Sequence, residues 1–366
     1  MLSEITGMKL TRYDLYSYSL PFYRPVTLGG ITLRHREGLL LKLSGDDGSG
    51  GWGESAPLPG FSGERLDEAA SQLRRLAGSI IGREVREDWV DPYGEFGREL
   101  EGIAPSVRFG FELAVWNLYG ESSGRTLPEL VTPAPRPIVP VNGLLAGSPA
   151  EVLAEARRMR DAGYRSVKLK IGTRTVDEDT ALVRALGEEL GEDISLRLDA
   201  NRAWGYEEAA EFVVGTAGVC FEYVEEPLAD PALLPGLVRE FGVPVALDES
   251  LVGIEPEELE DFAVAFVLKP SLLGGVSRTL RVAERAFRLG VTPVISSAYE
   301  SGVGTAALVA LAAGIGDRPV AAGLDPYRIM AEDVLETPLN LPAPSVDVRE
   351  TADASRTIAV RRLERL

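Results

Sequence analysis

From residue 138 onward, short apolar runs alternate with amphipathic stretches whose apolar residues recur at helical spacing. The short runs predict buried strands and the longer stretches predict helices, so the repeat indicates βαβ units around a parallel sheet. The predicted strands are Ile138–Leu145, Ser166–Ile171, Ser195–Ala200, Phe221–Glu226, Pro244–Glu249, Ala265–Lys269, Thr292–Ser297 and Ala321–Asp325. The best-defined predicted helices are Glu151–Ala162, Asp177–Leu190, Asp230–Phe241 and Val276–Leu289.

Eight predicted strands suit a closed barrel of alternating strands and helices. Gly163, Gly191, Gly242 and Gly290 follow the four helices, where a left-handed C-cap favours glycine. A doubly wound open sheet is the structural alternative. It is weakened because no G-x-G-x-x-G turn follows the first predicted strand.

The N-terminal part has a different pattern. Its predicted elements are the antiparallel strands Thr11–Leu20 and Leu39–Leu43, a turn at Gly45–Gly51, and the helices Arg65–Leu76 and Ser106–Leu118. We therefore expect an α+β domain over residues 1–132 and the barrel over residues 133–326. Residues 327–366 hold no complete βα unit and are expected to return to the first domain. The first seven residues are expected to form a disordered extension ahead of Met8.

Composition narrows the possible functions. The chain of 366 residues is 45% hydrophobic, which supports a large core, and its formal charge of −18 argues against nucleic acid or an anionic membrane as partner. The single cysteine, Cys220, excludes an intramolecular disulfide and fits a cytoplasmic protein. The single histidine, His35, lies outside the predicted barrel. Proton transfer in the barrel must therefore use Lys, Asp, Glu or Tyr.

Polar residues gather at the carboxyl ends of successive predicted strands. In strand order they are Lys168 and Lys170, then Arg197, Asp199 and Asn201, then Glu225, Asp248 and Lys269. Side chains alternate along a strand, so Lys168 and Lys170 point to the same side, which in this fold is the barrel interior. The same alternation groups Arg197, Asp199 and Asn201.

A single acidic residue after a strand is commonly the N-cap of the next helix, and a single lysine there is commonly solvated. Three carboxylates on three consecutive strands would instead converge at one barrel mouth and repel one another. A divalent cation removes that repulsion, and all-oxygen ligation completed by water suits Mg²⁺. The pattern therefore predicts a magnesium site at Asp199, Glu225 and Asp248, flanked by lysines.

A substrate carboxylate bound to that cation would present its α-carbon between the lysines. Removing the α-proton produces an enediolate with two negative charges, which the metal and nearby ammonium groups can stabilise where water is excluded. A lysine can act as the base only if its pKa is lowered. We expect the crowding of Lys168, Lys170, Lys269 and the metal to lower it.

The order K-x-K, D-x-N, E-E-P, D-E-S and K-P over Lys168–Pro270 resembles the enolase superfamily, in its muconate-lactonizing-enzyme subgroup. The resemblance covers nearly the whole chain and implies an α/β fold, a (β/α)₇β modified TIM barrel with an α+β capping domain. It implies Asp199, Glu225 and Asp248 as ligands of Mg²⁺, for which Mn²⁺ can substitute. It also implies Lys170 as general base, assisted by Lys168, with Lys269 opposite.

Further motifs are similar to those of the o-succinylbenzoate synthase family. They are Trp52-Gly53-Glu54, Pro57-Leu58-Pro59-Gly60-Phe61-Ser62, Pro105-Ser106-Val107 with Phe109-Gly110, the run Leu196–Trp204, Ile295-Ser296-Ser297 with Glu300-Ser301, and Gly323-Leu324-Asp325. The similarity implies substrate contacts at Ser296 and Gly323, and the other candidate contacts are Ser297, Arg197 and Asn201. It also implies that a loop with Pro57, Gly60, Phe61 and Ser62 closes over the pocket. From the residues alone, that loop is an ordinary Pro/Gly turn.

The implied reaction is the syn dehydration of 2-succinyl-6-hydroxy-2,4-cyclohexadiene-1-carboxylate to 2-succinylbenzoate, a step of menaquinone biosynthesis. Lys170 would remove the α-proton and return it to the departing hydroxyl, while Lys269 stabilises charge. The nearest alternative is an N-acylamino-acid racemase, or a bifunctional enzyme, in which Lys269 is a second base. The expected partner is a small-molecule carboxylate, and a homo-oligomer is compatible with the sequence.

Other readings are less favoured. A dipeptide epimerase usually carries Asp-x-Asp at the eighth strand, where this chain has Gly323-Leu324-Asp325. Sugar-acid dehydratases of the mandelate-racemase subgroup need a histidine on a late strand, and this sequence has none there. A non-catalytic, metal-stabilised barrel would be expected to have lost one of the three lysines or one of the three carboxylates. This sequence has all six of these residues.

Overall fold

The computed structural model of the protein describes residues 7–28, 30–341 and 343–366. The disordered extension was expected over the first seven residues. Residues 1–6 lie outside the described residues, and only Gly7 lies within them. The N-terminal part forms an antiparallel sheet in the order β13-β1-β2-β3. Its strands are β1 (Leu10–Leu28), β2 (Ile31–Gly45), β3 (Gly50–Ser55) and β13 (Glu364–Arg365). The predicted antiparallel pairing of the first two strands is confirmed. Both strands are longer than predicted, because β1 and β2 also pair along their more polar ends, which the apolar pattern did not include.

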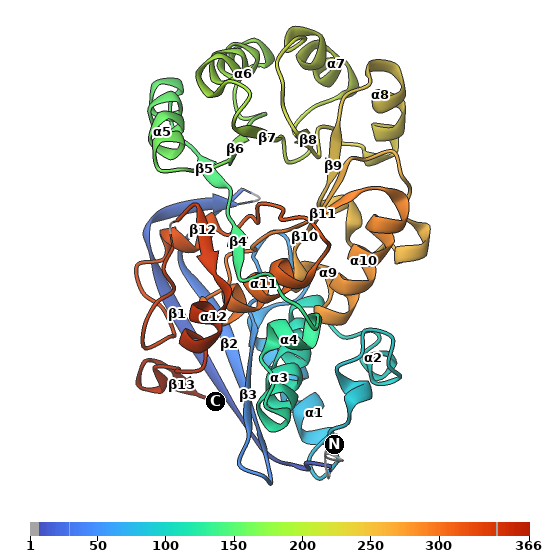
Figure 1. Ribbon diagram of the computed structural model, residues 1–366, viewed down its shortest axis with the longest axis vertical. Coiled ribbons are helices and arrows are strands. Elements are labelled where there is room, and N and C mark those ends of the chain that lie inside the picture. The colour runs from blue at the N-terminus through green and yellow to red at the C-terminus, as the bar shows by residue number, and fades with distance from the viewer. Residues whose placement is uncertain (1–6, 29, 342) are drawn as a thin grey trace.

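Helices accompany this sheet (Figure 1): α1 (Leu66–Ser79), α2 (Phe96–Glu99), α3 (Pro105–Ser123) and α4 (Leu127–Val131). The helix α3 packs on β3 so closely that side chains do not fit between the two backbones. A Cβ atom at Gly53 would lie 1.9 Å from the Gly110 carbonyl oxygen, and one at Gly110 would lie 2.8 Å from the Glu54 backbone. Close packing therefore accounts for the glycines in two of the motifs, Trp52-Gly53-Glu54 and Phe109-Gly110.

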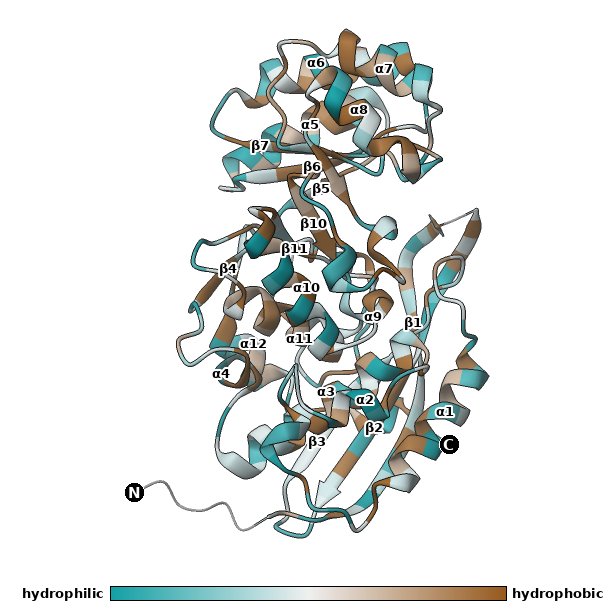
Figure 2. Cartoon of the chain, turned by 90° about the vertical axis from the view of Figure 1, so that its right-hand side faces the viewer, coloured by the Kyte–Doolittle hydropathy of each residue, from teal (hydrophilic) through white to brown (hydrophobic). Residues whose placement is uncertain are grey.

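Seven parallel strands form a second, curled sheet in the order β11-β10-β9-β8-β7-β6-β5. They are β5 (Gly143–Leu145), β6 (Ser166–Lys170), β7 (Ser195–Asp199), β8 (Tyr223–Glu225), β9 (Val245–Leu247), β10 (Ala265–Leu268) and β11 (Thr292–Ile295). The helices between them are α5 (Pro149–Asp161), α6 (Val176–Leu190), α7 (Tyr206–Gly215), α8 (Leu234–Phe241), α9 (Pro270–Leu273) and α10 (Val276–Leu289). The predicted alternation of strand and helix is confirmed. In Figure 2, the strands of the parallel sheet are mostly hydrophobic, whereas the helices around them carry both hydrophilic and hydrophobic residues.

The last predicted strand is wrong in its length. Only Ala322 and Gly323 pair, the first with Val141 and the second with Ser296, and a 3-10 helix begins at Asp325. The Ala322 amide donates to the Pro140 carbonyl at 2.8 Å, and the Gly323 amide donates to the Ile295 carbonyl at 2.8 Å. This short segment therefore bonds to β11 at one edge of the seven-stranded sheet and to residues 140 and 142, directly before β5, at the other.

The first predicted barrel strand, Ile138–Leu145, consists of two strands. Residues Ile138–Pro140 form β4, which pairs with β12 (Ser345–Asp347) in an antiparallel ribbon, and only β5 belongs to the parallel sheet. The helix α12 (Val348–Ala354) follows β12. The chain then returns to the first sheet, where Arg365 of β13 pairs with Tyr16 of β1. The C-terminal segment thus pairs with β4, which leads into the parallel sheet, and with β1 of the antiparallel sheet.

The helix α11 (Gly302–Gly314) packs at the junction of these parts and is almost entirely buried. At its N-terminus, the amides of Ser301 (2.8 Å) and Gly304 (2.7 Å) donate hydrogen bonds to the carboxylate of Glu54, which belongs to β3 of the first sheet. A negative charge at a helix N-terminus satisfies amides that have no partner within the helix. Among the described residues, none of the helices has both the length and the apolar character that a membrane span requires.

Candidate active site

Three carboxylates lie at the carboxyl ends of adjacent strands. Asp199 is the last residue of β7, Glu225 is the last residue of β8, and Asp248 directly follows β9. Asp199 and Glu225 are register partners, and the three side chains belong to residues that are 8%, 0% and 3% exposed. Asp248 precedes a short 3-10 helix, but its side chain makes no capping hydrogen bond. The parallel register, and not helix capping, therefore brings these carboxylates together.

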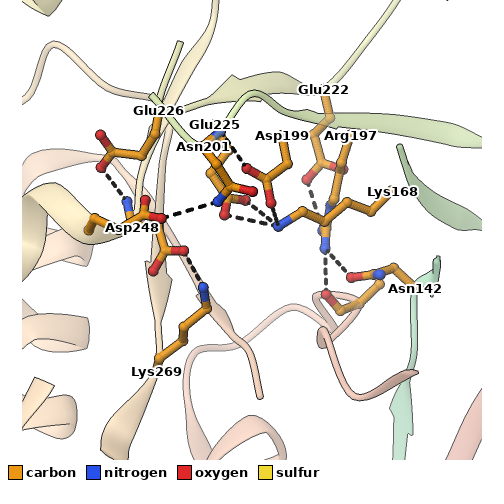
Figure 3. Close-up of polar contacts among 12 residues, drawn as sticks. Asn142, Lys168, Arg197, Asp199, Asn201, Glu222, Glu225, Glu226, Asp248 and Lys269 are labelled. Carbon is orange, nitrogen blue, oxygen red and sulfur yellow. Dashed lines mark hydrogen bonds and ion pairs between the residues drawn. The ribbon is translucent and has the colours of Figure 1, made fainter. Parts of the chain in front are cut away.

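Two lysines contact the carboxylates from different sides (Figure 3). Lys168 Nζ lies 2.8 Å from Asp199 Oδ2 and 2.7 Å from Glu225 Oε2, whereas Lys269 forms an ion pair with Asp248. Lys170 differs from both, because it is exposed and forms no ion pair within the part of the chain that the structure describes. Its backbone is the register partner of Asp199. Lys170 is therefore beside the cluster with its amine available.

Burial and charge shift the pKa values of the cluster. Burial raises the pKa of Glu225 well above its usual value, and the neighbouring Asp199 carboxylate raises it further. Burial alone lowers the pKa of Lys168, but the Asp199 and Glu225 carboxylates outweigh burial and raise that pKa well above its usual value. The pKa of Lys269 is likewise raised, by Asp248 against the opposing effect of burial. The expected lowering concerned a site that also holds a divalent cation and stays a prediction, because the raised pKa values of these two lysines are caused by carboxylates that no cation neutralises.

The donor chemistry of the cluster fits a hard divalent cation. Within the residues that the structure describes, no three acidic side chains are already arranged around one metal position, and lysine amines lie against Asp199 and Asp248. Two further buried oxygens, Asn201 Oδ1 and Glu249 Oε2, have no hydrogen-bond partner. Buried oxygens without donors are costly and favour the arrival of a positive charge. Three strand-end carboxylates and two unpartnered oxygens are ligand types that suit Mg²⁺.

Glu226, next to Glu225, holds the end of β9 in place. Its buried carboxylate accepts hydrogen bonds from the Asp248 amide (2.9 Å), the Ser250 amide (2.7 Å) and Arg202 Nε (3.1 Å). The first glutamate of the E-E-P motif therefore faces the site, and the second fixes the backbone of the D-E-S motif. The sequence analysis gave Glu226 no role. The occurrence of two consecutive glutamates in the E-E-P motif could have indicated one.

Replacing Glu226 by glutamine is expected to weaken Mg²⁺ binding by about 10–100-fold without unfolding the protein, because groups that orient a metal ligand have effects of that size. The glutamine amide cannot accept all the bonds that Glu226 now accepts, so Asp248 loses its fixed position. The measurement is a Mg²⁺ titration followed by thermal shift. Ser250→Ala keeps the amide bond and removes only the hydrogen bond that the Ser250 hydroxyl donates to Glu226 Oε2 (2.8 Å), so it serves as the matched variant with a smaller loss. Equal Mg²⁺ affinity in Glu226→Gln and the wild type would contradict this role.

Asn201, a predicted substrate contact, lies within the same cluster. Its amide nitrogen Nδ2 donates to Glu249 Oε1 at 3.1 Å, and its backbone amide donates to Asp199 Oδ1 at 3.1 Å. Asn201 Oδ1 is the buried atom without a partner noted above. The structure thus places Asn201 between two acidic side chains, and contact with a substrate stays a prediction.

Ser296 and Gly323 lie side by side at the closing edge of the sheet, as register partners. A Cβ atom on Gly323 would lie 2.5 Å from Ser296 Oγ, so glycine is required for the serine side chain to lie across it. The Ser297 hydroxyl has protein partners, because it donates to Glu300 Oε2 at 2.7 Å and accepts from the Tyr299 amide at 2.9 Å. Ser296 and Gly323 therefore fit a ligand-contact role better than Ser297 does.

Arg197 has a different environment from the one its strand position suggested. Its guanidinium donates to Glu222 at 2.8 and 3.0 Å, to Asn142 Oδ1 at 3.2 Å and to the Ala321 carbonyl at 2.7 Å, as Figure 3 partly shows. Arg197 is the register partner of Lys168, one layer below Lys170 and Asp199. The guanidinium of Arg197 thus bonds to protein groups, as a structural residue does. These contacts do not favour the predicted contact between Arg197 and the substrate.

The predicted capping loop forms a tight turn. The amides of Phe61 and Ser62 donate to the Leu58 carbonyl, Ser62 Oγ accepts from the Leu58 amide, and Gly60 has a positive φ of 87°. Phe61 packs with Leu28, Leu58, Leu272 and Ala298 in one apolar cluster. Leu272 and Ala298 follow β10 and β11, so the turn that contains Pro57, Gly60, Phe61 and Ser62 rests on segments at the carboxyl ends of the parallel strands.

Backbone strain is concentrated at the same ends. In the described part of the chain, the non-glycine residues with positive φ are Asn201, Arg202, Glu226 and Tyr299. The first three follow β7 and β8, and Tyr299 follows β11. Such conformations cost of the order of 1–3 kcal/mol each and persist only where surrounding contacts enforce them. Sequence analysis did not identify Tyr299 as a candidate site residue, because it lies between the motif residues Ser297 and Glu300 and belongs to neither motif.

Comparison with known proteins agrees with this architecture. Residues 151–352 match the family described as "Enolase C-terminal domain-like", and residues 10–118 match "MenC, N-terminal domain". The o-succinylbenzoate synthase of Yersinia pseudotuberculosis serotype O:1b (strain IP 31758) is 32% identical over 340 residues, which cover 92% of this chain and 96% of that protein. The protein PHYLLO, chloroplastic, of Arabidopsis thaliana is also 32% identical and covers 98% of this chain, but this chain spans only 23% of PHYLLO.

Among solved structures, muconate lactonizing enzyme from Pseudomonas fluorescens, complexed with muconolactone, superposes with a TM-score of 0.81. It is 27% identical, and the match covers 93% of this chain and 94% of that one. Sheet topology, strand-end carboxylates and sequence similarity therefore agree. The chain belongs to the enolase superfamily and, within it, to the o-succinylbenzoate synthase family.

Proposed function

We propose that the protein is a lyase that dehydrates 2-succinyl-6-hydroxy-2,4-cyclohexadiene-1-carboxylate to 2-succinylbenzoate, a step of menaquinone biosynthesis. The observation that carries the proposal is the site itself: three carboxylates at the ends of β7, β8 and β9, two lysines against them, and Lys170 with its amine available beside Asp199. The 32% identity to an o-succinylbenzoate synthase over nearly its full length supports this substrate.

The architecture that we infer is a (β/α)₇β barrel over residues 133–326 with an α+β capping domain over residues 1–132. Support comes from the bonds of Ala322 and Gly323 to both edges of the parallel sheet. Residues 327–366 are assigned to a C-terminal segment, which is supported by the pairing of β13 with β1. In this arrangement the capping loop and the carboxyl ends of the strands enclose the substrate.

Asp199, Glu225 and Asp248 are proposed to hold Mg²⁺, with Mn²⁺ as a possible substitute. When bound, the cation would neutralise negative charge that develops on the substrate carboxylate. The donor set is entirely oxygen, as Mg²⁺ prefers. For the cation to enter, Lys168 and Lys269 must move off these carboxylates. Their amines then become available to the substrate, and their pKa values lose the contribution that now raises them.

In the proposed reaction, Lys170 accepts the proton α to the substrate carboxylate and returns it to the hydroxyl that leaves as water. One residue suffices, because in a syn elimination both groups leave from the same face. Lys168 and Lys269 stabilise the negative charge that develops on the substrate. Formation of an aromatic ring drives the reaction forward. Ser296 and Gly323 are proposed to contact the succinyl carboxylate, with Asn201 at the other end of the pocket.

The test is an ultraviolet assay of 2-succinylbenzoate formation by the purified protein with Mg²⁺, run beside racemisation of N-succinyl amino acids. We expect dehydration to be the faster activity by a wide margin in kcat/KM. Racemisation without dehydration would contradict the proposed function and favour the racemase alternative.

Lys269→Met separates one-base from two-base chemistry. If Lys269 only stabilises charge, the variant keeps the exchange of the α-proton that Lys170 catalyses, although more slowly, and dehydration slows by about 100–1,000-fold, the effect expected for loss of one stabilising group. Proton exchange is measured by NMR in deuterated buffer for each stereoisomer of an N-succinyl amino acid. Loss of exchange for one stereoisomer alone would show that Lys269 is itself a base.

A further inference from the structure

We propose that Tyr299 contacts the substrate, with its hydroxyl donating a hydrogen bond to a substrate carboxylate, and that the buried Arg36 of the capping domain positions it. This inference rests on the proposed function and adds a capping-domain residue and a barrel-loop residue to that site. Neither belongs to the metal-ligand and lysine set, and they are linked by direct contact.

Tyr299 has a conformation that its own residue type disfavours. Its φ is 65°, in the left-handed region, which costs a non-glycine residue of the order of 1 kcal/mol or more. Three contacts enforce it: the Tyr299 amide donates to Ser297 Oγ (2.9 Å), the Ala298 amide donates to Glu300 Oε2 (2.7 Å), and Arg36 Nε donates to the Tyr299 carbonyl (3.0 Å). A residue held in this way against its preference indicates that the direction of its side chain matters.

The Tyr299 ring packs against residues of the capping domain. It packs edge-to-face against Phe22 of β1, with ring centroids 6.3 Å apart, and it also contacts the apolar cluster that contains Phe61. Burial raises the pKa of Tyr299, whereas the charges of Lys269 and Lys168 act on its hydroxyl in the opposite direction. The hydroxyl therefore lies within the electrostatic reach of both ammonium groups and stays protonated at neutral pH. An anionic ligand drawn to those amines would meet a hydrogen-bond donor there.

Arg36 is 1% exposed, and its hydrogen bonds within the described chain go to backbone carbonyls. It donates to Ala56 and to Pro57 (2.8 Å) at the start of the capping loop, and to Tyr299 (3.0 Å) and Ala298 (3.4 Å) in the loop after β11. A buried guanidinium can bridge several acceptors in one fixed plane because its donors are rigidly spaced. Arg36 thus joins the loop expected to cover the substrate to the loop that carries Tyr299.

The first variant is Tyr299→Phe, which keeps the ring and its packing and removes only the hydroxyl. We expect KM for the dehydration substrate and the Kd for 2-succinylbenzoate, measured by calorimetry with Mg²⁺, each to rise about tenfold, as expected for a lost hydrogen bond to a charged group. We expect kcat to change by less than about threefold, because the bond is present in both ground and transition states. Unchanged KM and Kd would overturn the inference.

The second variant is Arg36→Met, compared with Arg36→Lys. If Arg36 acts through Tyr299, Arg36→Met raises the same Kd, Arg36→Lys partly restores it, and the double variant with Tyr299→Phe is no weaker than the weaker single variant. Additive losses in the double variant would overturn the positioning role. If Arg36→Met does not fold, the comparison of Arg36→Lys with Tyr299→Phe gives the same test. A wild-type protein that neither turns over the substrate nor binds 2-succinylbenzoate would contradict the proposed function itself, and the inference would fall with it.

Discussion

Replacing Lys170 with methionine is expected to lower kcat for dehydration by on the order of ten-thousandfold, the upper end of the effect of a general acid–base group. The loss is large because the same amine is proposed to remove the α-proton and to protonate the leaving hydroxyl. Methionine keeps an unbranched side chain of similar length, so the fold and the ion pairs of Lys168 are expected to remain. The measurement is the steady-state rate of 2-succinylbenzoate formation, with Mg²⁺ affinity followed by thermal shift.

Lys9→Met is the matched control, because Lys9 is also exposed but precedes β1, in the N-terminal part of the chain. It is expected to retain wild-type kcat. A Lys170→Met variant that keeps more than about a tenth of wild-type kcat would show that another group transfers the proton. Lys168 would then be the next candidate, since it lies two residues away on the same side of β6.

Removal of the divalent cation is expected to abolish turnover, and Glu225→Gln is expected to reproduce that loss at ordinary Mg²⁺ concentrations. In the proposed site, Glu225 is the central one of three strand-end ligands and is fully buried. Saturating Mg²⁺ should stabilise the wild-type protein by about 3 kcal/mol at a hundredfold excess over Kd, seen as a rise in Tm of a few degrees. Glu225→Gln should show little of this rise, because a neutral amide is a poorer ligand than a carboxylate.

The control is Glu257→Gln, which changes an exposed glutamate in the loop after β9. It should keep both the Mg²⁺-dependent rise in Tm and full activity. Full activity of chelator-treated wild-type protein, or an undiminished Mg²⁺ response in Glu225→Gln, would contradict the assignment of the metal site. The two measurements separate loss of metal from loss of fold, because Tm is recorded in the presence and in the absence of Mg²⁺.

Much of the fold follows from local pattern. The helix predicted at Val276–Leu289 has those bounds in the structure. Gly242 and Gly290 are left-handed C-caps as predicted and Gly163 has a positive φ, whereas Gly191 has a φ of 63° with a ψ of −154°, outside the left-handed helical region. An amphipathic helix and a glycine cap are each decided by residues close in sequence. The helix α11 was not predicted, because it is apolar on all sides and its burial gives no periodic signal. Strand β3 was not predicted either. Its glycines are required by the close packing against α3 and give no apolar alternation along the sequence.

The sequence by itself determined which strand ends carry charge, because alternation along a strand and the order of strands in a parallel sheet are regular. That regularity places Lys168, Asp199, Glu225 and Lys269 on one side of one sheet. Only the tertiary structure decided the partners of each group, because those partners come from distant segments. Arg197 was predicted to face the substrate and instead bonds to Glu222, and Tyr299 takes its direction from Arg36, more than 260 positions earlier in the chain. Such contacts depend on how distant segments pack together, which no pattern along a single segment records.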